Sequence, residues 1–192
     1  MINDIFKTPL YNTIFDHLNQ KEMIDYCLKY KEDNPSDNRS NINGYQSKPL
    51  EGIHLPLNEM FKDIDYTCNA FCQRIGMRMP TFIQNCWINI NGPNSYNTEH
   101  RHPLAMVSGV FYISVPENSG DIVFTNPTEK MDMFWGKYFV DNFTPYNSVC
   151  SIHKPKDMEL LLFPSYLTHR VDINKSTENR ISISFNCVPI NS

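Results

Sequence analysis

The sequence contains no apolar run that approaches the roughly 20 residues of a membrane-spanning helix. Its start lacks the basic segment followed by an apolar segment that marks a secretory signal, so we expect a cytoplasmic protein, in the host cytoplasm if the chain is viral. No cluster of lysine and arginine marks a phosphate-binding surface, and the net charge is −4. Neither a membrane nor a long nucleic acid is therefore expected as a partner.

The sequence also lacks a C-x-x-C motif, although it contains six cysteines. Cys68 and Cys72 could share one face of a helix, but a zinc or redox site would need a second pair of this kind. We therefore expect reduced, mostly buried thiols that pack like small apolar side chains.

The composition is that of an ordinary globular protein, with 192 residues, 41% hydrophobic and 20% charged. A chain of this length can bury a substantial core within one domain. We expect a single domain over residues 1–192, divided into a helical N-terminal part with a loop (1–79) and a β-rich part (80–192).

Two helices precede the β-rich part. Apolar spacing predicts one helix within residues 11–33 and a second within residues 57–77. Between them, residues 34–50 are rich in Asn, Ser, Asp and Pro and predict a loop. Five β runs follow, at residues 81–92, 105–115, 120–126, 158–165 and 180–188. This order predicts an α+β fold, mainly β, with the helices packed on a sandwich or barrel.

The pair His100 and His102 in "NTEHRHPLAMVSGVFYI" is the first candidate for chemistry. Side chains at i and i+2 of an extended chain point to the same face, so both imidazoles can reach one ion. A catalytic metal needs three protein ligands and an open position, and His169, after an apolar strand and a turn, is the natural third candidate. An H-x-H pair alone is more often a solvated loop pair, and both interpretations stay open on this motif.

Polar and apolar residues alternate in the last β run, "RISISFN". Its polar set consists of Arg180, Ser182, Ser184 and Asn186. An arginine's planar fork binds a carboxylate through two parallel hydrogen bonds, and a serine two residues on can add a third. Together with the histidines, this R-x-S motif predicts a site for a metal-chelating dicarboxylate. The alternative for Arg180 is a charge on an edge strand, paired with an acidic neighbour such as Glu178.

Several phrases of the sequence resemble the Fe(II)/2-oxoglutarate-dependent oxygenases, and most of all the short oxygenases of phages and marine bacteria. They occur in order over residues 44 to 188 and read "GYQS", "WININGPNSYNTEHRHP", "SGVFYISVPENSGDIVFTNP", "LLLFPSYLTHRV" and "NRISISFN". The resemblance implies a double-stranded β-helix (jelly-roll) core over residues 80–192. It also implies a dioxygenase that uses Fe(II), 2-oxoglutarate and dioxygen to hydroxylate an unidentified substrate, either a small molecule or a protein side chain.

The superfamily holds its iron with an H-x-D/E…H triad. By resemblance, His100 is the first ligand and His169 the distal one, while His102 stands where Asp or Glu is expected. Three neutral ligands leave both positive charges on the metal, and the 2-oxoglutarate dianion would neutralise them. A carboxylate ligand would instead leave a net negative complex.

The same resemblance assigns the cosubstrate contacts. Arg180 with Ser182 would hold the C5 carboxylate of 2-oxoglutarate, and Tyr112 matches a tyrosine that contacts that carboxylate in related prolyl hydroxylases. Asn89, on the "WININ" strand, is a further candidate contact.

The aromatic segment from residue 126 to 150 is too long for an ordinary connection and predicts either a substrate lid or a surface cover. The lid candidates are Phe134, Trp135 and Tyr138.

Three other functions stay open at this point. A cupin-type dioxygenase shares the barrel, and Pro164 lies five residues before His169 as in one cupin signature, but the glutamate that should follow H-x-H is missing. A three-histidine zinc hydrolase or hydratase would use the same ligand set. A jelly roll can also be a non-catalytic binding or structural module, and exposed sheet edges make a homodimer an open expectation.

Overall fold

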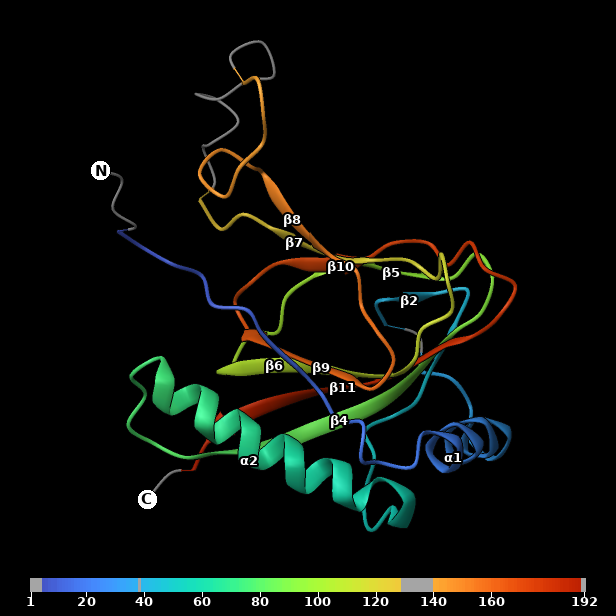
Figure 1. The fold of residues 1–192 in the computed structure, drawn as a ribbon. Helices are drawn as coiled ribbons and strands as arrows, with labels where there is room; N and C mark the ends of the chain where they lie inside the picture. The colour runs from blue at the N-terminus through green and yellow to red at the C-terminus, as the bar shows by residue number, and fades with distance from the viewer. Residues whose placement is uncertain (1–4, 38, 129–139, 191–192) are drawn as a thin grey trace.

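Two antiparallel β-sheets face each other in the computed structural model, which describes residues 5–37, 39–128 and 140–190 (Figure 1). The six-stranded sheet contains, in spatial order, β1 (Tyr11–Ile14), β9 (Glu159–Pro164), β6 (Val107–Ser114), β11 (Arg180–Pro189), β4 (Thr81–Asn91) and β3 (Tyr45–Gln46). The five-stranded sheet contains β2 (Asn41–Ile42), β5 (Tyr96–His100), β10 (His169–Val171), β7 (Ile122–Thr125) and β8 (Cys150–His153). The predicted fold, mainly β with a jelly-roll core, is confirmed.

Two helices, α1 (Gln20–Asp33) and α2 (Asn58–Arg74), cover the outer face of the six-stranded sheet, with the short 3-10 helix η1 (Leu55–Leu57) just before α2 (Figure 1). The second predicted helix is confirmed, and its apolar stripe packs on the sheet as the spacing indicated. The buried residues of this stripe are Met60, Ile64, Cys68, Phe71 and Cys72.

The prediction for the first helix was wrong at its start. Residues 11–14 form the strand β1, which pairs with β9, and the helix begins only at Gln20. The side chain of Asn19 accepts a hydrogen bond from the backbone N–H of Glu22 and so caps the helix. The pairing with β9 therefore outweighed the helical spacing, which continued across this boundary.

Several short strands were missed by the sequence analysis. Residues 34–50, predicted as a loop, contain β2 and β3, which pair with different sheets. The strands β8 and β10 have only four and three residues. Such short strands carry too few residues for a visible alternation, and their partners in the sheet decide their conformation.

The six-stranded sheet is buried on both faces. Ile181, Ile183 and Phe185 on β11 pack with the helices, while Leu161 and Phe163 on β9 face the five-stranded sheet. The predicted alternation in the last β run is thus confirmed, and its polar set faces the space between the two sheets. This interior polar face is where the candidate site lies.

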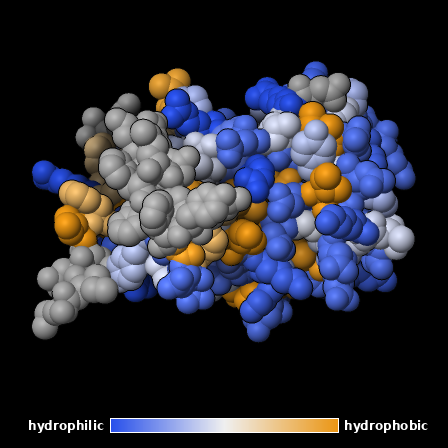
Figure 2. All heavy atoms as spheres, turned by 90° about the horizontal axis from the view of Figure 1, so that it is seen from above, coloured by the Kyte–Doolittle hydropathy of each residue, from blue (hydrophilic) through white to orange (hydrophobic). Residues whose placement is uncertain are grey.

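In the described part of the chain, no helix covers the five-stranded sheet on the opposite side. Seen from above in Figure 2, the surface on the side of the five-stranded sheet is mainly hydrophilic, with apolar side chains scattered among polar ones. In the ranges that the structure describes, no helix is long and apolar enough to cross a membrane. All six cysteines are free thiols and five of them are buried, as predicted.

Gly109 lies where β6 is sandwiched between β9 and β11, and it also lines the interior cavity. A Cβ at this position would collide with the Phe185 ring and would lie 2.8 Å from the backbone oxygen of Leu161. The backbone of β9 is held by its pairing with β6 and cannot move away easily. We therefore expect Gly109→Ala to lower the free energy of unfolding by about 1–3 kcal/mol, the usual cost of overpacking. Urea unfolding would measure this loss.

Gly92→Ala is the matched control, because a Cβ there meets only the side-chain oxygen of Asn179, at 3.1 Å. We expect this change to cost clearly less. Equal stability losses in the two variants would contradict the packing argument.

Candidate active site

Three histidines converge between the two sheets. His100 ends β5 and His169 begins β10, and the two residues are direct partners in the antiparallel pairing of these strands. His102 lies two residues beyond β5, where its backbone N–H donates to the carbonyl of Ser165. One candidate ligand atom from each imidazole lies within 4.8 Å of the others. Strand pairing therefore brings together residues almost 70 positions apart in the sequence.

Backbone carbonyls orient two of the three rings. Nδ1 of His100 lies 2.7 Å from the carbonyl oxygen of Thr98, and Nδ1 of His169 lies 2.9 Å from that of Leu167. A proton held on Nδ1 by such a bond leaves the lone pair on Nε2, which is how metal-binding histidines are commonly oriented. His102 makes no such bond to another described residue.

The imidazoles are neutral near pH 7. Burial, followed by the proximity of His100, lowers the pKa of His169 to about 3 and that of His102 to about 4. Burial also lowers the pKa of His100, against an opposing effect of its bond to Thr98. Neutral imidazoles are the form that binds a metal. Because imidazole nitrogen suits iron, zinc, copper and nickel, the donor set fits a divalent transition metal.

Arg180 is buried on the central strand β11, with 2% of its surface exposed. Its Nη1 donates to the carbonyls of Ser119 and Gly120, at 2.5 and 3.2 Å. In the described part of the chain no carboxylate lies within ion-pair distance of the guanidinium. Burial lowers the pKa of Arg180, whereas Tyr112, Asp121 and Asp172 oppose this shift.

This placement contradicts the alternative of an edge-strand charge paired with Glu178, because β11 lies between β6 and β4. A buried guanidinium without a bound carboxylate is costly unless an anion completes it. Arg180 can therefore hold an anionic ligand.

Ser182, Tyr112 and Asn89 lie side by side across three strands. In the pairing register Ser182 is opposite Tyr112 on β6 and opposite Asn89 on β4. No hydrogen bond joins the hydroxyl of Ser182 or of Tyr112 to another described residue. Burial raises the pKa of Tyr112 to about 12, so its phenol stays protonated and can donate. These two hydroxyls can bind a ligand directly.

The amide of Asn89 already makes two hydrogen bonds within the protein. Its Nδ2 donates to the hydroxyl of Ser184 at 3.0 Å, and its Oδ1 accepts a longer bond from Asn41. Asn41 in turn bonds Asn91, so that a buried amide network fixes this corner of the cavity.

One cavity collects all seven metal and cosubstrate residues that the sequence analysis singled out. They are His100, His102, His169, Arg180, Ser182, Tyr112 and Asn89. The lid candidates Phe134, Trp135 and Tyr138 lie outside the described residues. The cavity therefore has three imidazoles that could hold a metal at one end and Arg180, which could hold an anion, at the other.

A second cavity next to the histidines was missed by the sequence analysis. It has a volume of about 280 Å³, and Arg39, Gln46, Asn85 and Trp87 contribute to its walls. One signal was available, because Asn85 and Trp87 precede Asn89 on β4 at spacings of two and so point to the same face. The contribution of Arg39 and Gln46 had no such signal, since their segment was expected to be a loop.

Comparisons with known proteins agree with this geometry. A family model described as "Putative 2OG-Fe(II) oxygenase" matches residues 85–186. No curated protein matches the sequence.

Solved structures share the fold at low sequence identity. A prolyl-4-hydroxylase from Pseudomonas putida has a TM-score of 0.67 and 13% identity, over 96% of this chain and 94% of that one. HygX from Streptomyces hygroscopicus, solved with nickel and 2-oxoglutarate bound, has a TM-score of 0.64 and 12% identity, over 95% and 83% of the two chains. A Trichoplax adhaerens prolyl hydroxylase in complex with a hypoxia inducible factor peptide has a TM-score of 0.58 and 13% identity, over 92% and 83%.

Proposed function

The chain belongs to the 2OG-Fe(II) oxygenase family, and on that premise we propose that His100, His102 and His169 hold the Fe(II) while Arg180 holds the 2-oxoglutarate. The protein is an oxygenase that depends on Fe(II) and 2-oxoglutarate and acts with dioxygen on an unidentified substrate. One observation carries the assignment of residues: three neutral imidazoles and a buried, uncompensated arginine line the same cavity.

The iron and its cosubstrate supply the oxidising chemistry. Overall, dioxygen and 2-oxoglutarate are consumed, succinate and carbon dioxide leave, and the second oxygen atom converts a substrate C–H into C–OH. The histidines contribute one neutral nitrogen each and, through Thr98 and Leu167, a fixed ring orientation for two of them. Among the described residues no carboxylate joins the three imidazoles, so the dianionic cosubstrate would balance the charge of the metal.

Arg180 binds the distal carboxylate of 2-oxoglutarate with its planar fork. The hydroxyls of Ser182 and Tyr112 add donors from the neighbouring positions on β11 and β6. Apolar walls, which include Val110, Phe163 and Ile122, exclude water and strengthen these contacts. In this proposal Asn89 positions the wall through its bond to Ser184 and is at most a secondary contact.

The alternatives from the sequence analysis are less well supported. Neither a cupin-type dioxygenase nor a three-histidine zinc hydrolase requires a carboxylate-binding arginine at the far end of the metal cavity. A purely structural module requires neither the neutral imidazole cluster nor the uncompensated charge of Arg180, both of which cost stability without a ligand.

Several broader expectations remain proposals. Six free thiols suit a reducing compartment and thus support a cytoplasmic location, in the host if the chain is viral. The shared core of α2, β4 and β11 supports one domain over residues 1–192, with the jelly roll from residue 80. The edge strands β3 and β8 are candidates for contact in a homodimer. A lid formed around Phe134, Trp135 and Tyr138 stays a prediction.

Anaerobic visible absorption tests the proposal. We expect the apo-protein, titrated with Fe(II) and then with 2-oxoglutarate, to develop a charge-transfer band that needs both additions. Admission of dioxygen should then release succinate. Iron binding without the band would indicate a three-histidine metal site of another kind, and absence of iron binding would refute the assignment of the histidines.

A further inference from the structure

The second cavity adjoins the metal-binding end of the first. His100, His102 and Trp87 line both cavities, but only the first contains Arg180 and only the second contains Arg39. The two arginines thus lie in different cavities that meet at the imidazoles. A molecule in the second cavity would reach the metal site without displacing a ligand of Arg180.

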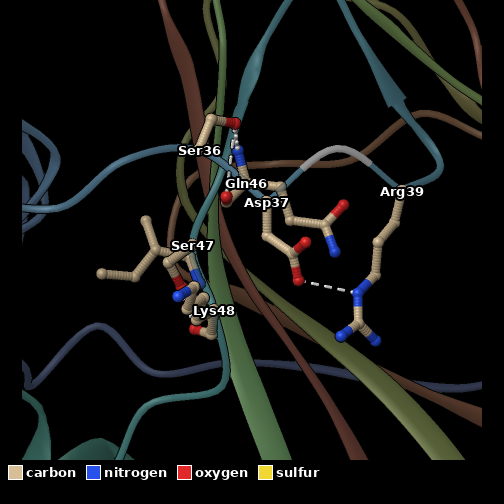
Figure 3. A network of polar contacts seen from close by, with 7 residues as sticks. Ser36, Asp37, Arg39, Gln46, Ser47 and Lys48 are labelled. Atoms are coloured by element: carbon tan, nitrogen blue, oxygen red, sulfur yellow. Dashed lines mark hydrogen bonds and ion pairs between the residues drawn. The ribbon is translucent and has the colours of Figure 1, made fainter.

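A polar network holds Arg39 and Gln46, two residues of the lining of the second cavity. Nε of Arg39 lies 2.8 Å from Oδ2 of Asp37, whose backbone N–H donates to the carbonyl of Gln46 at 2.7 Å. The hydroxyl of Ser36 bonds the backbone of Gln46 as well, which ties this segment to β3. Figure 3 shows the Asp37 carboxylate, the Arg39 guanidinium and the Gln46 amide on the same side of the chain.

The Arg39 guanidinium is paired through one nitrogen and has donors left for a ligand. Its pairing with Asp37 uses Nε, and both Nη groups have no partner in the described part of the chain. The Arg39 side chain is 64% exposed and that of Asp37 28%. An exposed i, i+2 pair contributes little to stability. The free edge of the guanidinium is suited to a carboxylate, which it can bind through two parallel hydrogen bonds.

Gln46 supplies a second, independent sign of a ligand. The residue is only 4% exposed, it lines the cavity, and its Oε1 is buried without a hydrogen-bond partner. Buried side-chain oxygens in proteins are almost always satisfied. Nε2 of Gln46 has no described partner either, so the whole side-chain amide is unpaired. A half-turn of the amide exchanges the two atoms, and either an acceptor or a donor can then be presented to a ligand in the cavity.

Other residues of the lining, Asn85 and Trp87, offer a further donor and an aromatic ring. Nδ2 of Asn186 donates to Oδ1 of Asn85, while Oδ1 of Asn186 accepts from the hydroxyl of Ser108. This chain fixes the Asn85 amide so that its own NH₂ group remains available. The Trp87 ring lies 5.8 Å, centroid to centroid, from the His102 ring. An apolar group in the cavity can therefore lie along Trp87 on its way to the metal site.

We infer that the prime substrate is a free α-amino acid, with its carboxylate on the Arg39 fork, its ammonium on the Gln46 amide and its side chain along Trp87. This inference rests on the proposed function. The volume of the second cavity, about 280 Å³, lies just below the roughly 300–1,000 Å³ typical of pockets for drug-sized ligands. It therefore suits a smaller molecule such as an amino acid. An internal residue of a polypeptide carries neither charged group and would offer Arg39 and Gln46 only neutral amide partners.

The test uses the Fe(II) and 2-oxoglutarate complex of the whole chain, with the twenty L-amino acids as probes. Under anaerobic conditions we expect at least one of them to shift the charge-transfer band at millimolar concentration and, in air, to speed succinate formation by about tenfold or more. The C-terminal amide and the N-acetyl derivative of that amino acid should bind at least about tenfold more weakly, since each removes one charge-assisted contact.

Two variants test the residues. Arg39→Ala should weaken binding of the amino acid about tenfold or more, while the Fe(II) and 2-oxoglutarate band still forms. Arg74→Ala removes the same charge from the exposed end of α2 and should leave the affinity for the amino acid unchanged.

Several outcomes would overturn the inference. They are a normal band that none of the twenty amino acids perturbs, equal binding of the amide derivative, and tighter binding of a peptide that contains the same residue internally. If the band itself never forms, the proposed function fails and the inference falls with it, so the two failures are distinguishable.

Discussion

Replacing Arg180 with alanine is expected to weaken 2-oxoglutarate binding about 100-fold or more while Fe(II) binding persists. The guanidinium is buried and no described carboxylate lies within ion-pair distance of it, so the ligand carboxylate is its natural counterion. Removing one partner of a buried, hydrogen-bonded charge pair costs about 2–5 kcal/mol, and about 2.7 kcal/mol corresponds to 100-fold in affinity. Titration of the iron-loaded variant with 2-oxoglutarate, followed by the charge-transfer band, measures the loss.

Two further variants separate the ligand contact from a general effect. Arg180→Lys keeps the charge but not the planar fork, and we expect an intermediate loss of about tenfold. Arg170→Ala removes the same charge from the next residue after His169, where the side chain is 41% exposed and paired with Asp172, and it should leave 2-oxoglutarate affinity unchanged. Wild-type affinity in Arg180→Ala, with the fold intact by thermal melting, would place the cosubstrate carboxylate elsewhere.

Replacing His169 with alanine is expected to reduce Fe(II) affinity at least about 100-fold. Loss of a supporting contact around a metal ligand typically costs 10–100-fold, and loss of the ligand itself should cost more. Anaerobic equilibrium dialysis with Fe(II), and with Mn(II) as a redox-stable substitute, measures the affinity. His17→Ala is the control, because that side chain is half exposed and pairs with Asp63 on α2. Equal metal affinity in both variants would refute the three-histidine site.

His102→Asp tests what the unusual third ligand does. The change creates the H-x-D pattern of the superfamily, so we expect Fe(II) binding to persist within about tenfold. The ligand carboxylate removes one positive charge from the metal, and the affinity for dianionic 2-oxoglutarate should therefore fall by about tenfold. The same spectroscopic titration measures it. A higher 2-oxoglutarate affinity in His102→Asp would contradict this charge argument.

The long elements were predictable because their side chains repeat a clear pattern. The stripe of Met60, Ile64 and Cys68 predicted α2, and the alternation from Arg180 to Cys187 predicted β11 with its polar face inward. The family phrases, and above all His100, His169 and Arg180, pointed to the residues that we propose for the metal and the cosubstrate. These signals are local in the sequence, and a local pattern determines which face of an element is polar.

The convergence of these residues was decided by the tertiary structure. Pairing of β5 with β10 sets His100 against His169, and the register of β4, β6 and β11 aligns Asn89, Tyr112 and Ser182. The start of α1 was decided in the same way. Residues 11–14 pair with β9 as the strand β1 and are therefore not part of the helix.

By itself, the sequence determined the family, the β-rich core and the chemistry of the interior polar face. Only the tertiary structure decided that Arg39 and Gln46, from a polar part of the chain, join His100 and His102 in the lining of a second cavity. The physical reason is that β2 and β3 have two residues each, too few for a periodic signal, and take their positions from the strands β5 and β4 with which they pair.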